Sequence, residues 1–175
     1  MKRTLALLAL LALSGCSTNT STSVNDTTTP NDVITTAESR CIQPEPDLTD
    51  ANAVADAAAL MLACHDTQTD SSSFDGMRRA TPWLDPALLD GLPTEAPADA
   101  NWTEMALHHG WTEVTVETII MEAEPDLSST PVILTRMTTA TPTGDDGWSG
   151  STETTYWSLT MEKMDENWVI TNIGL

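Results

Sequence analysis

Residues 111–120 read WTEVTVETII, and this stretch decides the fold class. One set of alternating positions is Val114, Val116, Thr118 and Ile120, and the other is Thr115, Glu117, Ile119 and Met121. A period of two places successive side chains on opposite faces of a β-strand. We therefore predict a strand that presents one set to each face of a sheet.

Three further segments after residue 130 show the same period. The second has Val132, Leu134, Arg136 and Thr138 on one face; the third alternates Trp157, Leu159 and Met161 with Tyr156, Ser158, Thr160 and Glu162; the fourth contains Trp168, Ile170 and Ile173. The links at 125–130, 143–150 and 165–167 have turn compositions. We predict four antiparallel strands.

Helical spacing dominates the region before residue 111. Residues 50–64 are rich in alanine, and Thr49 or Asp50 is a candidate N-cap. Shorter helices are predicted after the serines at 71–73, over 85–89 and over 101–109, where Asn101 and Glu104 are spaced like a capping box. Helices first and strands afterwards predict an α+β domain, with the N-terminal helices packed on one face of a four-stranded antiparallel sheet.

Two groups of residues resemble known families. The segments 51–64, 70–72, RATPWL at 79–84 and WTEV at 111–114 resemble secreted proteins and lipoproteins of actinobacteria. The ending at 157–170, with NWVI at 167–170, is similar to the last hairpin of nuclear-transport-factor-two-like (cystatin-like) domains. The resemblance covers roughly residues 45–175. It implies that the helices and a curved sheet enclose a cone-like hollow, which relatives use as a ligand pocket, as an enzyme site or not at all.

The N-terminus reads MKRTLALLALLALSGC over residues 1–16. Its apolar core of about nine residues is shorter than the roughly 20 that a membrane span needs, so it predicts a cleavable signal peptide. Leu13-Ser14-Gly15-Cys16 is similar to the lipobox of bacterial lipoproteins, in which the cysteine receives a diacylglyceryl group and becomes the first residue. The resemblance implies a lipid on Cys16 that holds the protein at the extracytoplasmic face of the cell membrane. The alternative is an ordinary signal peptide with a chance cysteine.

The domain organisation follows from this N-terminus. Residues 17–37 contain 11 Ser or Thr among 21, a composition that cannot bury enough apolar surface to order a chain. We predict a signal peptide over 1–15, a lipidated cysteine with a disordered tether over 16–40, and a single α+β domain over 41–175.

Two cysteines remain if Cys16 carries a lipid. Cys41 and Cys64 then lie in an oxidising compartment, where disulfides persist. A helix over 50–64 is about 21 Å long, and residues 41–50 reach back about 30 Å when extended. The geometry therefore allows a Cys41–Cys64 disulfide, which we predict; two unpaired thiols are the alternative.

The mature chain is strongly acidic. All 26 Asp and Glu follow residue 16, and five Lys and Arg remain after cleavage, so the formal charge is −21 (5 minus 26). Such a surface repels phosphate backbones and anionic lipid head groups, so we expect no nucleic-acid partner. The charge is interpreted as an adaptation for solubility, with an acidic docking face as the alternative.

Candidate chemical sites are few. His108 and His109 point about 100° apart on a helix and do not share a target, and the Asp145-Asp146-Gly147 run is typical of a hairpin turn rather than of a calcium loop. No known catalytic motif occurs, so we assign no catalytic residue, metal or cofactor. Four tryptophans are in phase with apolar positions and are predicted in the core: Trp83, Trp111, Trp157 and Trp168. Trp148, between two glycines, is the candidate for an exposed contact.

Two functions fit these features. The anchor, the spacer and a domain without catalytic groups favour a non-enzymatic accessory or interaction domain, whose expected partners are the membrane and an envelope protein complex. The alternative is a small-ligand-binding or enzymatic domain that uses the cone-like hollow, with His109, Arg136 or Tyr156 lining it. A roomy hollow with converging His, Asp or Tyr side chains would favour the alternative, and a closed apolar one would argue against an enzyme.

Overall fold

The computed structural model describes residues 38–90, 99–120 and 125–175. The predicted signal peptide, Cys16 and the Ser/Thr-rich spacer lie outside the described residues. The elements, in chain order, are α1 (Ala51–Ala63), α2 (Asp75–Ala80), the 3-10 helix η1 (Thr81–Trp83), α3 (Pro86–Asp90), α4 (Ala100–Leu107), β1 (Trp111–Ile119), β2 (Val132–Thr143), β3 (Glu153–Met164) and β4 (Asn167–Gly174). Helices precede strands, and the α+β class is confirmed.

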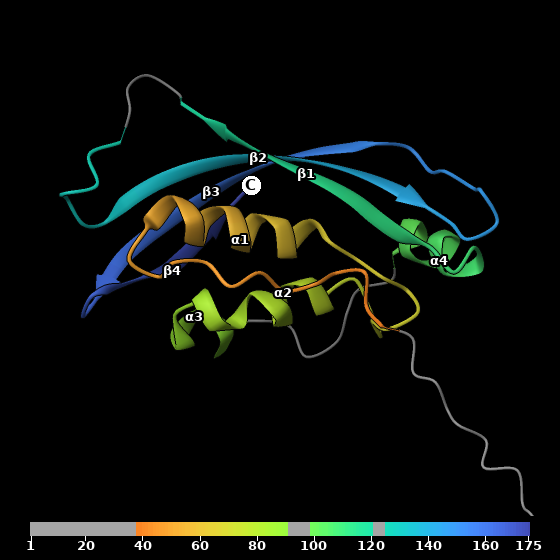
Figure 1. Cartoon of the computed structure of the whole chain (residues 1–175), viewed down its shortest axis with the longest axis horizontal. Helices are drawn as coiled ribbons and strands as arrows, with labels where there is room; N and C mark the ends of the chain where they lie inside the picture. The colour runs from red at the N-terminus through yellow and green to blue at the C-terminus, as the bar shows by residue number, and fades with distance from the viewer. Residues whose placement is uncertain (1–37, 91–98, 121–124) are drawn as a thin grey trace, which may run out of the picture. The chain divides into compact units, whose positions relative to one another are not determined.

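The four strands form one antiparallel sheet in the order β1-β2-β3-β4. Val116 pairs with Thr138, and Leu134 pairs with Leu159, so the alternating sets named above meet on one face. That face is buried along β2 and β3, at Val132, Leu134, Leu159 and Met161. The sheet is curved, and its concave face lies over α1 (Figure 1).

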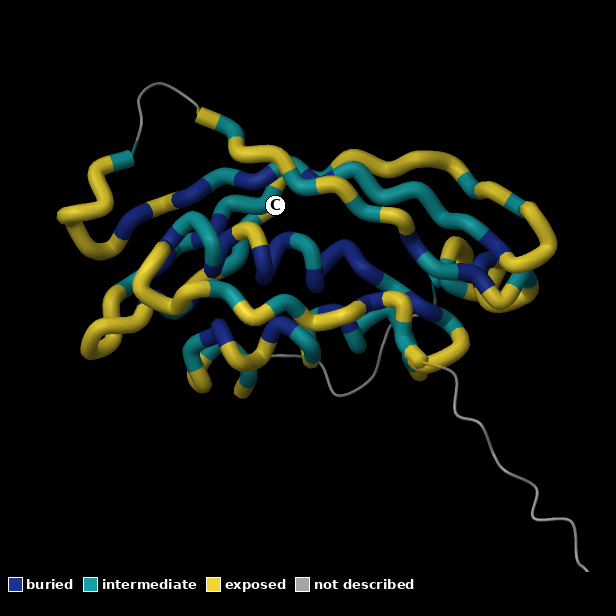
Figure 2. Tube along the Cα trace, viewed as in Figure 1, coloured by how far each residue is buried: buried dark blue, intermediate teal, exposed yellow. Residues whose placement is uncertain are grey.

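Helix α1 fills the centre of the concave face and contacts all four strands. Its alanines allow close packing, and Val54, Ala58 and Met61 are fully buried (Figure 2). The helix begins where predicted, because the Asp50 carboxylate accepts hydrogen bonds from the backbone N–H groups of Asn52 and Ala53. Burial of this apolar stripe, rather than helix propensity, supplies most of the stability of such a helix.

The predicted disulfide between Cys41 and Cys64 is present, with the two Cα atoms 5.7 Å apart. It joins the segment before α1 to the residue that ends α1. That segment runs alongside α1 on the side away from the sheet (Figure 1). Farther along it, the carbonyl oxygen of Leu48 accepts a hydrogen bond from the backbone N–H of Trp168 at 2.8 Å.

Helix α4 differs from the prediction at its start. The expected capping box between Asn101 and Glu104 is absent, and the helix begins one residue earlier, at Ala100. Asp99 is the N-cap, because its carboxylate accepts hydrogen bonds from the backbone N–H groups of Asn101 and Trp102. None of the helices in the described ranges is long and apolar enough to cross a membrane.

Candidate functional site

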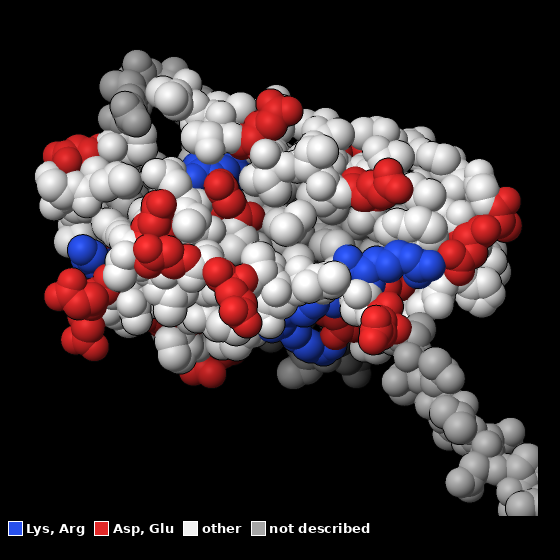
Figure 3. Space-filling model, viewed as in Figure 1, with Lys and Arg blue, Asp and Glu red and all other residues white. Residues whose placement is uncertain are grey.

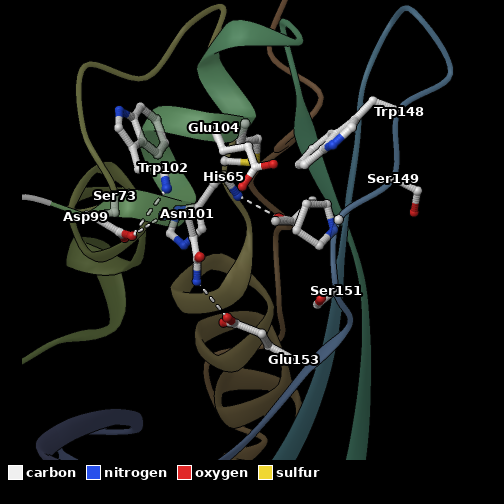
Figure 4. A pocket seen from close by; sticks show the side chains of 14 residues that line it. His65, Ser73, Asp99, Asn101, Trp102, Glu104, Trp148, Ser149, Ser151 and Glu153 are labelled. Carbon is white, nitrogen blue, oxygen red and sulfur yellow. Dashed lines mark hydrogen bonds between the residues drawn. The ribbon is translucent and has the colours of Figure 1, made fainter.

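A cavity of about 410 Å³ lies at one end of the sheet, beyond the C-terminal end of α1. Helix α4, the end of β2, the β2–β3 connection and the start of β3 surround it (Figure 4). Thr112 and Pro142 form part of its wall and are paired in the β1–β2 register. They occupy the same alternating positions as the buried residues under α1, so this cavity, here called the end cavity, continues the concave face.

The β2–β3 connection fixes one wall of the end cavity. The Asp146 carboxylate accepts a hydrogen bond from the backbone N–H of Trp148 at 2.9 Å and lies 2.8 Å from Nδ1 of His108. The indole of Trp148 stacks on the His108 imidazole, with ring centroids 4.5 Å apart. Gly147 adopts a φ of 84°, a left-handed conformation that glycine adopts without steric cost. The predicted turn therefore also holds an aromatic side chain in place.

His65 lies at the inner side of the end cavity, directly after the end of α1. Its backbone N–H donates to Oγ1 of Thr112 at 2.8 Å, and its carbonyl oxygen accepts from the N–H of Thr112 at 2.9 Å. The imidazole meets the edge of the Trp102 ring at 6.1 Å, and its Nδ1 is buried without a hydrogen-bond partner in the described chain. Burial lowers the pKa of His65 below its ordinary value of 6.5, so the imidazole is neutral at pH 7.

Three carboxylates border the end cavity: Asp99, Glu104 and Glu153. The first two belong to the N-terminal half of α4 and its cap, and the third begins β3, more than 45 residues later. Glu153 accepts a hydrogen bond from the side-chain amide of Asn101 at 2.8 Å, which joins the two elements. Within the described ranges none of the three forms an ion pair. The lining is thus acidic and aromatic, and internal hydrogen bonds hold the carboxylates of Asp99 and Glu153 in place.

The residues singled out from the sequence are not gathered in one place. Trp148 lines the end cavity. Arg136 lies under α1, hydrogen-bonded to Asn52 at 2.8 Å and ion-paired with Asp56. Tyr156 is 54% exposed at a position that alternates with the buried residues of β3, so it faces the opposite side of the sheet.

His109 is the fourth of these residues, and it is exposed with a φ of 49°. Its carbonyl oxygen accepts a hydrogen bond from Nε2 of Gln68 at 3.3 Å. Helix α4 ends at Leu107, before both histidines, so the helical spacing expected for His108 and His109 is absent. The two side chains still have different surroundings, since His108 binds Asp146 and stacks on Trp148. Neither His109 nor Tyr156 is among the residues that line the end cavity.

Sequence reasoning did not single out His65 and Trp102 as site residues. The only signal at His65 is a histidine near a helix C-terminus, which favours an exposed position beside the helix dipole. Its place in the end cavity depends on the pairing of residue 66 with β1, a contact between segments about 45 residues apart. No local pattern encodes such a pairing.

Among the described residues, no group of three His, Cys, Asp or Glu side chains is placed to hold a metal ion. The chain was compared with models of protein families, with curated proteins and with solved structures, and none of them matches it.

Proposed function

We propose that this protein is a lipoprotein, held at the extracytoplasmic face of the cell membrane by a lipid on Cys16, whose folded domain binds a small ligand in the end cavity. One observation carries the ligand-binding part: a cavity of about 410 Å³ that is lined by a histidine, three carboxylates and two tryptophans. Cavities of roughly 300–1,000 Å³ are typical of small-molecule sites. A roomy hollow lined by polar groups favours ligand binding over a purely structural domain.

The lining is already organised for binding. Asp99 is fixed by two backbone N–H groups, Glu153 by Asn101, and Trp148 by its stacking on His108. Groups that are held before binding lose little conformational freedom when a ligand arrives, and this increases affinity. The curved sheet over α1 also supports, as a proposal, the nuclear-transport-factor-two-like relationship that the last hairpin suggests.

A second candidate function is that of an accessory domain that docks an envelope protein. It is favoured by the outer face of the sheet, where Ile133 and Tyr156 are 59% and 54% exposed. Ile133 of β2 pairs with Thr160 of β3, which lies four residues from Tyr156 on the same face of that strand. The two functions are compatible, because the end cavity and this outer face lie on opposite sides of the sheet.

The anchor is tested by the Cys16→Ala variant expressed in the native host. A thiol is required for lipid attachment, so the variant should leave the membrane fraction while the wild type stays in it. Circular dichroism of the released protein should retain the signal of the folded domain, because Cys41 and Cys64 are untouched. Retention of Cys16→Ala in washed membranes would show that the lipoprotein assignment is wrong.

The cavity is tested with wild-type protein extracted from membranes in a non-ionic detergent. A panel of sugars, amino acids, amines and carboxylic acids is screened by thermal unfolding, because a ligand that binds only the folded state raises the unfolding temperature. Ser151→Trp, which places a large ring at the rim of the end cavity, should abolish every shift that the panel produces. A panel without any shift, or shifts that survive in Ser151→Trp, would exclude the end cavity as the binding site.

A further inference from the structure

We infer that the ligand of the end cavity is a small organic cation with alkyl groups on its charged centre, such as an alkylammonium ion. The inference rests on the proposed ligand-binding function and specifies the chemistry of the same site. It is carried by two features of the lining: carboxylates without a cation of their own, and aromatic walls beside them.

Among the residues that the structure describes, no Lys or Arg side chain pairs with a carboxylate of the end cavity. Each of the four arginines in the described ranges is paired elsewhere: Arg40 with Asp145, Arg78 with Asp75, Arg79 with Asp70 and Arg136 with Asp56. Lys163 lies over the ring of Trp168, far along β3 from Glu153. The remaining Lys2 and Arg3 belong to the predicted signal peptide. The counter-charge for the three carboxylates therefore comes from outside the chain.

Figure 3 shows the same imbalance at the surface. On the face in view the few Lys and Arg side chains lie beside carboxylates, and further Asp and Glu side chains are scattered over the rest. His65 adds no positive charge to the end cavity, because burial lowers its pKa and so favours the neutral imidazole. A cation is thus drawn to the end cavity both by the overall charge and by the local carboxylates.

The walls specify an organic cation rather than a bare metal ion. Trp102, Trp148, Met105 and Pro142 supply aromatic and apolar surface next to the carboxylates. Metal ions such as Ca²⁺ need six to eight oxygen ligands, and apolar walls provide none. An alkylammonium uses both features, since its charge is attracted to the carboxylates and to the faces of tryptophan rings while its alkyl groups are removed from water.

The deciding experiment compares two ligands of the same shape. Choline carries a quaternary nitrogen, and 3,3-dimethylbutan-1-ol replaces that nitrogen by carbon. Binding to the full-length protein in non-ionic detergent is measured by calorimetry at low salt. We expect choline to bind about tenfold or more tightly than the neutral alcohol, because only its charge interacts with the carboxylates and the indoles. Equal affinities would overturn the inference.

Two charge-removing variants locate the effect. Glu104→Gln and Glu153→Gln keep the shape of the side chains, and each should weaken choline binding by about fivefold or more without changing the affinity of the alcohol. Glu162→Gln is the matched control on the other face of β3, and it should bind choline like the wild type. Unchanged choline affinity in both cavity variants would also overturn the inference.

The remaining outcomes separate this inference from the proposed function. A neutral sugar that binds in the end cavity, with choline inactive, would leave the ligand-binding function standing and exclude a cationic ligand. If choline, the sugars and the rest of the panel all fail to bind, both the inference and the proposed function are wrong. Tetramethylammonium serves as a second cationic probe, so that the hydroxyl group of choline does not decide the result.

Discussion

Arg136 carries a positive charge into the space between the sheet and α1, where its side chain is only 1% exposed. Its guanidinium is satisfied by Asp56, by the side-chain oxygen of Asn52 and by the carbonyl oxygen of Thr135. A buried charge of this kind is tolerated when it is paired and hydrogen-bonded, and removal of one partner is strongly destabilising. The contacts with Asp56 and Asn52, both in α1, therefore hold this helix in register with β2.

We predict that Asp56→Ala lowers the free energy of unfolding by about 1–3 kcal/mol, because it leaves the guanidinium without its counter-charge. The upper end of the range for buried pairs does not apply, since the Asp56 side chain is 53% exposed and water screens part of the interaction. Urea unfolding measures the change. Asp90→Ala, at an exposed helical position, is the control and should stay within about 0.5 kcal/mol of the wild type.

His65 makes the folded domain sensitive to acid in a defined direction. Burial lowers the pKa of His65 in the folded state, whereas in the unfolded chain it stays near 6.5. As the pH falls through 6.5, the unfolded chain binds a proton that the folded domain does not, so stability falls. The stability that depends on the neutral His65 ring is fully present above pH 6.5. It is lost as the pH falls from 6.5 to the lower pKa that His65 has in the folded domain.

The test is an NMR titration of the His65 ring in the folded protein, whose midpoint is expected below 6.5. Urea unfolding between pH 7.5 and 5.5 should show a steeper loss of stability for the wild type than for His65→Gln, because the difference between the two isolates this one group. A ring midpoint above 6.5 would contradict the prediction.

The burial of Arg136 could be predicted from the sequence, but its ion-pair partner could not. The alternation of β2 places Arg136 on the same face as Leu134 and Thr138, and the structure confirms that this face is buried. The partner of Arg136 is Asp56, 80 residues earlier, and no spacing rule connects two residues across that distance. Periodicity is a local property, whereas an ion pair between layers depends on how the layers pack.

At the scale of elements, α1 and α2 pack so closely that the contact depends on one glycine. A Cβ atom on Gly76 would lie 2.5 Å from the carbonyl oxygen of Met61, and 3.3 Å from the carbonyl oxygens of Leu62 and Cys64. All three are backbone atoms of α1 or its end, so they cannot turn aside as a side chain can. The absence of a side chain at residue 76 is therefore what allows the two helices to meet.

We predict that Gly76→Ala destabilises the domain by about 1–3 kcal/mol, because the new methyl group forces the helices apart. The sign is opposite to the usual effect, since alanine in place of glycine ordinarily stabilises a helix by about 1 kcal/mol. Thermal or urea unfolding gives the answer. Gly174→Ala is the matched control, because a Cβ there meets only ordinary contacts at 3.5 Å. Increased stability in Gly76→Ala would refute this view of the α1–α2 contact.

The elements differ in how well their sequences define them. The strands and α1 are predicted well because each carries a long apolar repeat of one period. Helix α4 has eight residues, and its start is set by a single hydrogen-bonding cap at Asp99, which competes in the sequence with the equally plausible Asn101. Short helices are decided by such caps and by tertiary contacts rather than by periodicity.

At the scale of the whole molecule, the sequence predicts the architecture but not its cavity. The order of helices and strands limits the domain to a few layered arrangements. The end cavity, by contrast, is formed where His65, α4 and the β2–β3 connection meet, and each of these segments is irregular or short. The four residues proposed from the sequence as pocket or contact candidates were chosen for their chemistry, and only Trp148 is positioned to contribute to this site.

The net charge makes one further prediction for the whole molecule, namely that salt stabilises it. Raising the ionic strength from 0.01 M to 0.1 M shortens the Debye length from about 30 Å to about 10 Å. Repulsion among widely spaced carboxylates is screened over this range, and the mature chain has 26 acidic and five basic residues. Salt weakens the attraction within the ion pairs of the described residues less than it weakens this long-range repulsion, because the paired atoms are close together. Arg40 and Asp145, for example, are only 2.9 Å apart.

We therefore expect the unfolding temperature to rise by roughly 3–5 °C between 0.01 M and 0.1 M NaCl, the shift produced by about 1 kcal/mol in a domain of this size. Calorimetry at pH 7.5 measures it, and KCl should give the same rise, because screening depends on ionic strength and not on the identity of the cation. A falling unfolding temperature would mean that the ion pairs contribute more to stability than the net charge removes. It would also count against cation binding in the end cavity, since that proposal requires negative charge that the protein's own Lys and Arg side chains do not neutralise.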